Sequence, residues 1–200
     1  MSGLVAQASL REFFKTVLQD AIRGHDVAVA EPTEFYLVNL LSEFAATDRL
    51  FTEQTEGGRD HEPLALLYHR AQQQEREERI RTLRRLGDVS LYKAGFFSES
   101  LNRTAVGPEY YIQMGSTSYG AVASLAPASG FAAVYRELCE KFRALVEVLE
   151  EIAARGLAAA GAQGTLKVYE TWIRTGNERL QKVLVDAGFI PLTSKDGLVN

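Results

Sequence analysis

Two neighbouring segments in the middle of the chain, 89–103 and 109–126, carry side chains that could hold a small molecule between them. With the residue just before the first segment, these are Asp88, Tyr92, Lys93, Tyr111, Met114, Ser118 and Tyr119. Buried hydroxyl, amine and carboxyl groups need hydrogen-bond partners, which a ligand between two packed helices would supply. One hypothesis is therefore a ligand pocket between these two segments.

The same residues have a second interpretation that needs no ligand. Asp88 follows Gly87, and an aspartate at such a place accepts the free amides of a helix that begins after it. Lys93 then faces water, and each tyrosine donates its hydroxyl to a backbone carbonyl. We prefer this interpretation, because capping alone accounts for Asp88.

The known catalytic patterns do not occur in the sequence. It contains no glycine-rich phosphate loop followed by a lysine, no G-x-S-x-G, no H-E-x-x-H and no Glu-x-x-His. Cys139 is the single cysteine and is expected to be a small core residue, because no residue near it in the sequence would activate the thiol. We therefore expect no catalytic residue and no cofactor.

The three histidines do not form a metal site in the sequence pattern. His61 and His69 are eight residues apart, a rise of about 12 Å if both lay on one helix. The Asp60-His61-Glu62 triplet lies in a polar, glycine-flanked stretch, where solvated side chains are the simpler expectation. We expect surface histidines and no bound metal.

A run of arginines from 70 to 85 forms a second candidate surface. The residues that we expect to bind a partner are Arg76, Arg79, Arg84 and Arg85. They would dock to an acidic protein or to the acidic N-terminal third of a second copy, since residues 1–62 contain 11 acids and 5 bases. Nucleic-acid binding through the helix 70–85 is a further alternative, although the interleaved glutamates and the net charge of -4 oppose it.

Helical spacing of apolar residues runs along almost the whole chain, so the sequence predicts an all-α fold. We expect one domain over 1–200, a bundle of about six or seven helices, with the segments 89–103 and 109–126 innermost. Gln72 to Arg79 is polar on every side, but Glu75 and Arg79 are spaced to support a solvated helix there. Gly87 and Asp88 are expected to end one helix and start the next.

The chain has no formal charge from Tyr110 to Tyr135, a run of 26 residues. A membrane span is one interpretation, but polar residues and the Pro127 break leave only about 17 suitable residues, at the lower limit for spanning. The alternative is a helix buried inside the bundle, where charges would be costly. We expect the buried helix and no membrane partner.

The C-terminal part has the most regular pattern. Two apolar repeats that alternate steps of three and four residues predict an antiparallel helical hairpin over 130–187, with Ser129 capping its first helix. Residues 191–200 are expected to form a flexible tail. Phe189 and the apolar residues after it would fold back over the bundle.

These expectations favour binding over catalysis. The leading hypothesis is a non-catalytic cytoplasmic regulatory or scaffold-type protein, acting on a protein partner or as a homodimer through a helical surface. A cytoplasmic location follows because one cysteine cannot form an internal disulfide and the first residues lack the pattern of a signal peptide. A small-molecule sensor or enzyme and a nucleic-acid binder are the two alternatives.

Overall fold

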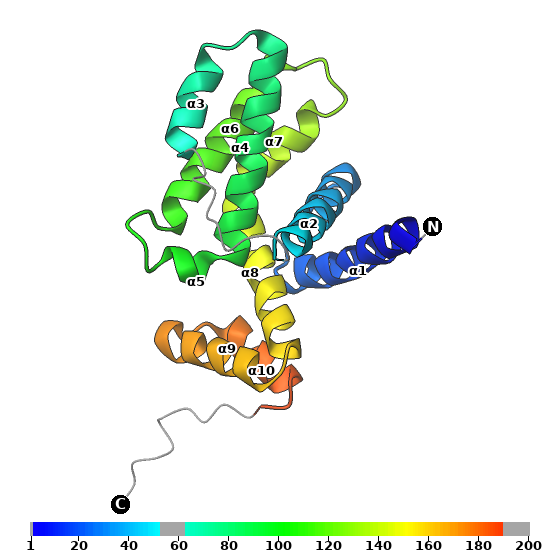
Figure 1. Ribbon diagram of the computed structural model, residues 1–200, viewed down its shortest axis with the longest axis vertical. Helices are drawn as coiled ribbons and strands as arrows, with labels where there is room; N and C mark the ends of the chain where they lie inside the picture. The colour runs from blue at the N-terminus through cyan, green and yellow to red at the C-terminus, as the bar shows by residue number, and fades with distance from the viewer. Residues whose placement is uncertain (1, 53–62, 190–200) are drawn as a thin grey trace, which may run out of the picture. The chain divides into compact units, whose positions relative to one another are not determined.

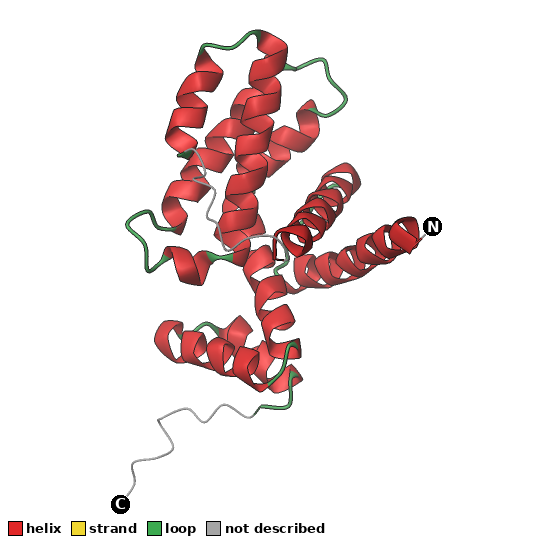
Figure 2. Ribbon diagram, in the orientation of Figure 1, coloured by secondary structure: helices red, strands yellow, loops and turns green. Residues whose placement is uncertain are grey.

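The computed structural model describes the backbone of residues 2–52 and 63–189, and side chains within 10–45 and 63–189. Within these ranges every regular element is a helix (Figure 2), so the predicted all-α class is confirmed. The described part holds ten helices, against the six or seven expected. The chain divides into two compact units, residues 1–149 and 150–200, which are described separately. The single domain expected over 1–200 stays a prediction.

Helices of the N-terminal unit are labelled in Figure 1. Their bounds are α1 Ser2–Gly24, α2 Glu31–Thr52, α3 Leu64–Gln72, α4 Arg76–Phe96, α5 Ser98–Leu101, α6 Pro108–Leu125 and α7 Ala132–Glu140. Helix α8, Phe142–Ala159, begins in this unit and ends in the next. Helix α2 ends at Thr52, and residues 53–62 lie outside the described part.

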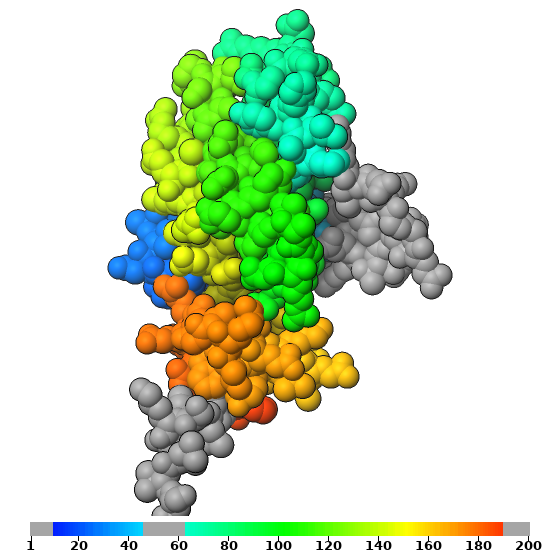
Figure 3. Space-filling view, turned by 90° about the vertical axis from the view of Figure 1, so that its left-hand side faces the viewer, coloured from blue at the N-terminus to red at the C-terminus, as the bar shows by residue number. Residues whose placement is uncertain are grey.

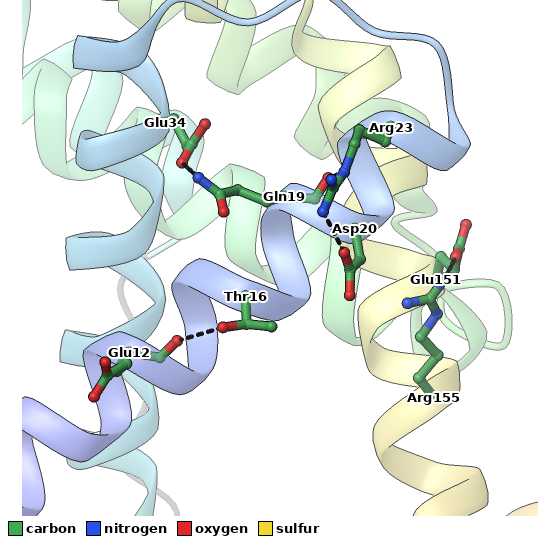
Figure 4. Close-up of polar contacts among 8 residues, drawn as sticks. All are labelled: Glu12, Thr16, Gln19, Asp20, Arg23, Glu34, Glu151 and Arg155. Atoms are coloured by element: carbon green, nitrogen blue, oxygen red, sulfur yellow. Dashed lines mark hydrogen bonds and ion pairs between the residues drawn. The ribbon is translucent and has the colours of Figure 1, made fainter.

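Helices α1 and α2 lie side by side and antiparallel, joined by a short non-helical connection (Figure 1). Leu18, Leu37 and Leu41 are fully buried and form part of their apolar face. The Gln19 side chain donates a hydrogen bond of 2.6 Å to Glu34 across the pair, as Figure 4 shows. The two helices therefore contact each other along buried residues and through one side-chain hydrogen bond.

A turn separates α3 from α4 where the sequence predicts a continuous solvated helix. The chain leaves the helix after Gln72 and re-enters it at Arg76. Arg79 of α4 donates to the Gln72 side chain, and Thr82 donates to Gln74 at 2.7 Å. The prediction is wrong because these glutamines bond to the next helix instead of continuing a helix in water.

Gly87 and Asp88 lie inside α4, so the predicted helix end and start at this point are also wrong. The reason for Gly87 is space. A Cβ atom built there would lie 2.6 Å from Cδ1 of Tyr119 and closer still to Cε1, and Tyr119 is fully buried. Glycine at this position lets the Tyr119 ring of α6 lie against the backbone of α4. The side chain of any larger residue would overlap that ring.

Helix α6 packs against α4 on one side and α7 on the other (Figure 1). Tyr119 and Val122 are fully buried on its inner face, whereas Gln113 and Thr117 are exposed on the opposite face. In Figure 3 the green segment that includes α5 and the start of α6 reaches the surface. The uncharged run is thus buried along one face only, and no described helix meets the length and hydropathy needed to cross a membrane.

The predicted hairpin over 130–187 is replaced by four shorter helices. Its first arm is divided between α7 and α8 at Lys141, and α7 follows Phe131, with no side-chain cap from Ser129. Its second arm is divided between α9, Ala162–Thr175, and α10, Glu178–Asp186. Gly176 ends α9 in the left-handed conformation with φ of 64°, and the Asn177 side chain caps α10.

The C-terminal unit has a small core of its own. Its buried members come from the end of α8 and from α9 and α10, and they are Ala154, Val168, Trp172, Val183 and Leu184. Arg155 bonds to Glu151 one turn earlier on α8 (Figure 4). Phe189 contacts Tyr169 with ring centroids 6.1 Å apart. The expected tail at 191–200, and the apolar residues directly after Phe189, lie outside the described residues.

Candidate functional site

A buried carboxylate stands at the point where four helices of the N-terminal unit meet. Asp88 of α4 is 9% exposed, and its Oδ1 atom accepts two hydrogen bonds. Tyr36 of α2 donates one at 2.5 Å, and Tyr119 of α6 donates the other at 2.8 Å. Phenol hydroxyls that bond to a carboxylate make strong, charge-assisted contacts. Asp88 therefore joins α2, α4 and α6 through one oxygen atom.

Arg84 and Tyr135 complete this group, which we call the Asp88 cluster. The Nε atom of Arg84 lies 3.7 Å from Oδ2 of Asp88, one helical turn away. Tyr135 of α7 hydrogen-bonds with Arg84, and its ring lies 5.6 Å from that of Tyr36 and 5.9 Å from that of Tyr119. Both carboxylate oxygens of Asp88 thus have partners, and α7 is tied into the same network.

The electrostatics of the Asp88 cluster are dominated by burial. Burial raises the pKa of Asp88 above its ordinary value, although the bonds from Tyr36 and Tyr119 and the charge of Arg84 act in the opposite direction. Burial and the neighbouring carboxylate raise the pKa of Tyr36 and of Tyr119 far above that of a free phenol. Both tyrosines therefore stay protonated as donors, committed to Asp88.

The residues expected to line a ligand pocket fall into separate places. Asp88 and Tyr119 are bonded to each other, as described. The hydroxyl of Ser118 donates to the carbonyl of Met114 within α6 at 2.7 Å. The remaining three residues make ring contacts: Tyr92 stacks on Phe44 and Phe96, and the ammonium of Lys93 lies 5.8 Å from the ring centre of Tyr111. The structure thus brings together Asp88 and Tyr119 but not the set of seven.

Each of the four arginines expected to bind a partner has an intramolecular contact. Arg76 donates two hydrogen bonds, at 3.0 and 2.5 Å, to the carbonyl of Leu125 at the end of α6. Arg79 bonds to Gln72, Arg84 pairs with Asp88, and Arg85 lies over the ring of Phe44 at 5.3 Å. Arg76, Arg84 and Arg85 remain exposed, but part of their bonding capacity is already used within the chain.

Sequence reasoning missed the α2 and α7 partners of Asp88. Tyr36 has apolar spacing along α2, and 52 residues separate it from Asp88. It also missed Glu137 of α7, whose carboxylate accepts from the backbone N–H of Ala30 and, at 2.5 Å, from the hydroxyl of Thr33. A glutamate within a regular apolar repeat gives no local sign of such a role.

The described histidines and the cysteine lie apart from the Asp88 cluster. His25, expected at the surface, is buried, with Nδ1 4.0 Å from Glu147, whereas His69 is exposed and His61 lies outside the described residues. Cys139 is half-buried, and burial raises the pKa of its thiol, which disfavours the reactive thiolate. Within the described side chains, no three His, Cys, Asp or Glu residues lie together as a metal site would require.

Comparison of the chain with models of protein families, with curated proteins and with solved structures gives no match. Function has to be argued from the geometry of the chain itself.

Proposed function

We propose that this protein is a non-catalytic regulatory or scaffold-type protein of the cytoplasm that acts through protein–protein contacts on a helical surface. The observation that supports this proposal most is on α9. Leu166 and Ile173, seven residues apart, are 54% and 62% exposed. Large apolar side chains that repeat at this interval on one helix are typical of a helix that packs on another helix.

The apolar face of α9 extends beyond the residues that are buried in the core of the C-terminal unit. Val168 and Trp172 are buried in the core of the C-terminal unit. Leu166 and Ile173 lie on the adjoining flank of the helix, with the half-buried Tyr169 between them, and the ring of Phe189 extends this flank. Covering one leucine or isoleucine side chain fully stabilises an association by about 1.5–3 kcal/mol before the costs of binding.

We propose a second copy of the chain as the partner. Residues 150–189 carry five acids and five bases, so two copies of this unit bear no net charge that would repel. A helix with a seven-residue apolar spacing also suits a symmetric pair, in which the same patch is used twice. The four arginines are then not required for the association, which agrees with their contacts inside the chain.

Light scattering coupled to gel filtration tests the proposal on the full-length chain. We expect a dimer whose fraction rises with concentration, and a monomer when Leu166 and Ile173 are both replaced by serine. Leu66→Ser is the matched control, since Leu66 on α3 is 58% exposed but lies outside this flank. A wild-type chain that stays monomeric up to millimolar concentration, or a double variant that dimerises as the wild type does, would contradict the proposal.

A further inference from the structure

The N-terminal arm, which we define as α1, α2 and their connection (residues 2–52), is attached to the rest of its unit at few places. Its large buried leucines, such as Leu18, Leu37 and Leu41, belong to helices that pack on each other. On the side of α4 and α7, helix α2 contributes Thr33, Tyr36 and Phe44 to the contacts. Elements that make few contacts with the remainder of a protein are the ones that open first.

One attachment is formed at the connection and the start of α2. The carboxylate of Glu137 accepts from the N–H of Ala30 and from Thr33, and Lys141 donates to the carbonyl of Ala28. Lys141 also pairs with Glu137 at 2.7 Å. These bonds hold the N-terminus of α2 to α7.

A second attachment is the Asp88 cluster with the rings beside it, and a third is His25 of the arm, whose Nδ1 lies 4.0 Å from the carboxylate of Glu147 on α8. Tyr36 reaches Asp88, and further along α2 the ring of Phe44 stacks on Tyr92, with centroids 4.4 Å apart, and lies under Arg85. Without the arm, Asp88 would keep Tyr119 and Arg84 as partners and would gain access to water. Departure of the arm therefore changes the surroundings of this carboxylate from protein to water on one side.

We propose that docking of the N-terminal arm is linked to a proton on Asp88: the arm is held most tightly when Asp88 is protonated, and loss of this proton favours release of the arm. The charged carboxylate is better solvated by water than by the rings that enclose it, so ionisation favours the open state. A protonated Asp88 still accepts from Tyr36 and Tyr119 on its carbonyl oxygen, so docking does not require the charge.

Charged and titratable groups face Asp88 from each element packed against it. They are Tyr36 from α2, Arg84 and Arg85 from α4, Tyr119 from α6 and Tyr135 from α7. Burial raises the pKa of Asp88 while the arm is docked. Release of the arm exposes the carboxylate to water and removes this effect of burial. The state in which the pKa is higher binds the proton more tightly, which gives the direction of the linkage.

Release of the arm would uncover a surface of defined chemistry. Tyr92, Tyr119 and Tyr135 are less than 10% exposed, and α2 contributes ring contacts to all three through Phe44 and Tyr36. Arg84 and Arg85 border these rings. The opened unit would thus present aromatic rings next to positive charge.

Hydrogen exchange measured by mass spectrometry on the full-length chain tests the linkage between pH 4 and 8. After correction for the intrinsic exchange rate, we expect protection of the α2 amides to fall by up to about tenfold per pH unit as Asp88 ionises. Amides of α6, which α4 and α7 also cover, serve as the internal reference. Asp88→Asn keeps an acceptor oxygen but cannot ionise, and we expect its α2 protection to lose this fall.

Asp88→Asn retains Glu137 and His25, so the difference between wild type and variant isolates the proton on Asp88. Tyr36→Phe removes one donor to the ionised carboxylate, and we expect the midpoint of the fall to move to higher pH. Wild-type α2 protection that is constant or rises with pH would overturn the proposal. So would an unchanged fall in Asp88→Asn or, if that variant does not fold, a midpoint unmoved in Tyr36→Phe.

Discussion

Tyr36 on α2 and Asp88 on α4 are joined by a hydrogen bond of 2.5 Å across 52 residues of sequence. The bond links the first helical pair of the chain to the helices that follow it. Tyr119 donates to the same oxygen atom, and its ring lies 6.4 Å from the ring of Tyr36, so two neighbouring tyrosines hold one carboxylate oxygen.

Two substitutions of Asp88 separate the effect of its charge on the free energy of unfolding from the effect of its acceptor oxygen. In Asp88→Asn we expect the free energy of unfolding at pH 7 to stay within about 1 kcal/mol of the wild type or to rise, since the amide oxygen still accepts and no charge is buried. In Asp88→Ala we expect a loss of at least about 1–3 kcal/mol, because the Tyr119 hydroxyl is left buried without its acceptor. Urea unfolding measures both.

The raised pKa of Asp88 also fixes the sign of a pH dependence. Its contribution to stability is greatest when it is protonated, and it declines as pH rises through the carboxyl's titration in the folded state. We expect the difference in unfolding free energy between Asp88→Asn and wild type to grow with pH until Asp88 is fully ionised, and to be constant above that pH. A difference that shrinks as pH rises would contradict this assignment.

Removal of one hydroxyl at a time compares the two donors. Tyr119 is fully buried and Tyr36 is partly exposed, so water can replace the bond lost from Tyr36 more easily than the bond lost from Tyr119. We expect Tyr119→Phe to lower the free energy of unfolding by about 1.5–3 kcal/mol and Tyr36→Phe by less. Equal losses in urea unfolding would mean that both hydroxyls are equally shielded from water.

Glu137 is expected to behave oppositely to Asp88 in acid. Burial opposes its ionisation, but the bonds from Lys141, Thr33 and Ala30 prevail and lower its pKa below the ordinary value of 4.5. Its contribution to stability is therefore complete above that ordinary value and is lost as pH falls through the folded one. We expect Glu137→Gln to be less stable than wild type at pH 7 by about 1–3 kcal/mol, with a smaller gap at pH 3.

Gly87 tests the contact between α4 and α6. We expect Gly87→Ala to lower the free energy of unfolding by about 1–3 kcal/mol, because the added methyl overlaps the ring of Tyr119. Gly156 inside α8 has no atom within 4 Å of an added Cβ and is the matched control. Gly156→Ala should raise stability by about 0.5–1 kcal/mol through helix propensity alone. A neutral Gly87→Ala would show that the ring can move aside.

The all-α fold class was predictable from the sequence because apolar residues recur at helical spacing over most of the chain. Gly87-Asp88 was misread because the pair has the local form of a helix end and a cap, while its actual cause is the ring of Tyr119 on another helix. The break at Gln73 was missed for a similar reason, since the bonds that stabilise it come from Arg79 and Thr82. Local patterns carry no information about such distant partners.

The candidate site was likewise predictable from the sequence only in part. Asp88 and Tyr119 were singled out by type, and they do meet. Tyr36 and Tyr135 were not, because a tyrosine at an apolar position is equally compatible with ordinary core packing. Which ring reaches Asp88 depends on how α2 and α7 pack against α4, and sequence periodicity does not specify that packing.

Trp172 is the single tryptophan of the chain, and it is buried in the small core that α9 and α10 share with the end of α8. Tryptophan emission therefore reports on the C-terminal unit alone, while the tyrosine-rich Asp88 cluster contributes its ultraviolet signal from the N-terminal unit. One denaturation experiment read at two wavelengths can follow both parts of the molecule with no label attached, with Tyr169 as the one tyrosine that the C-terminal unit adds to the tyrosine signal.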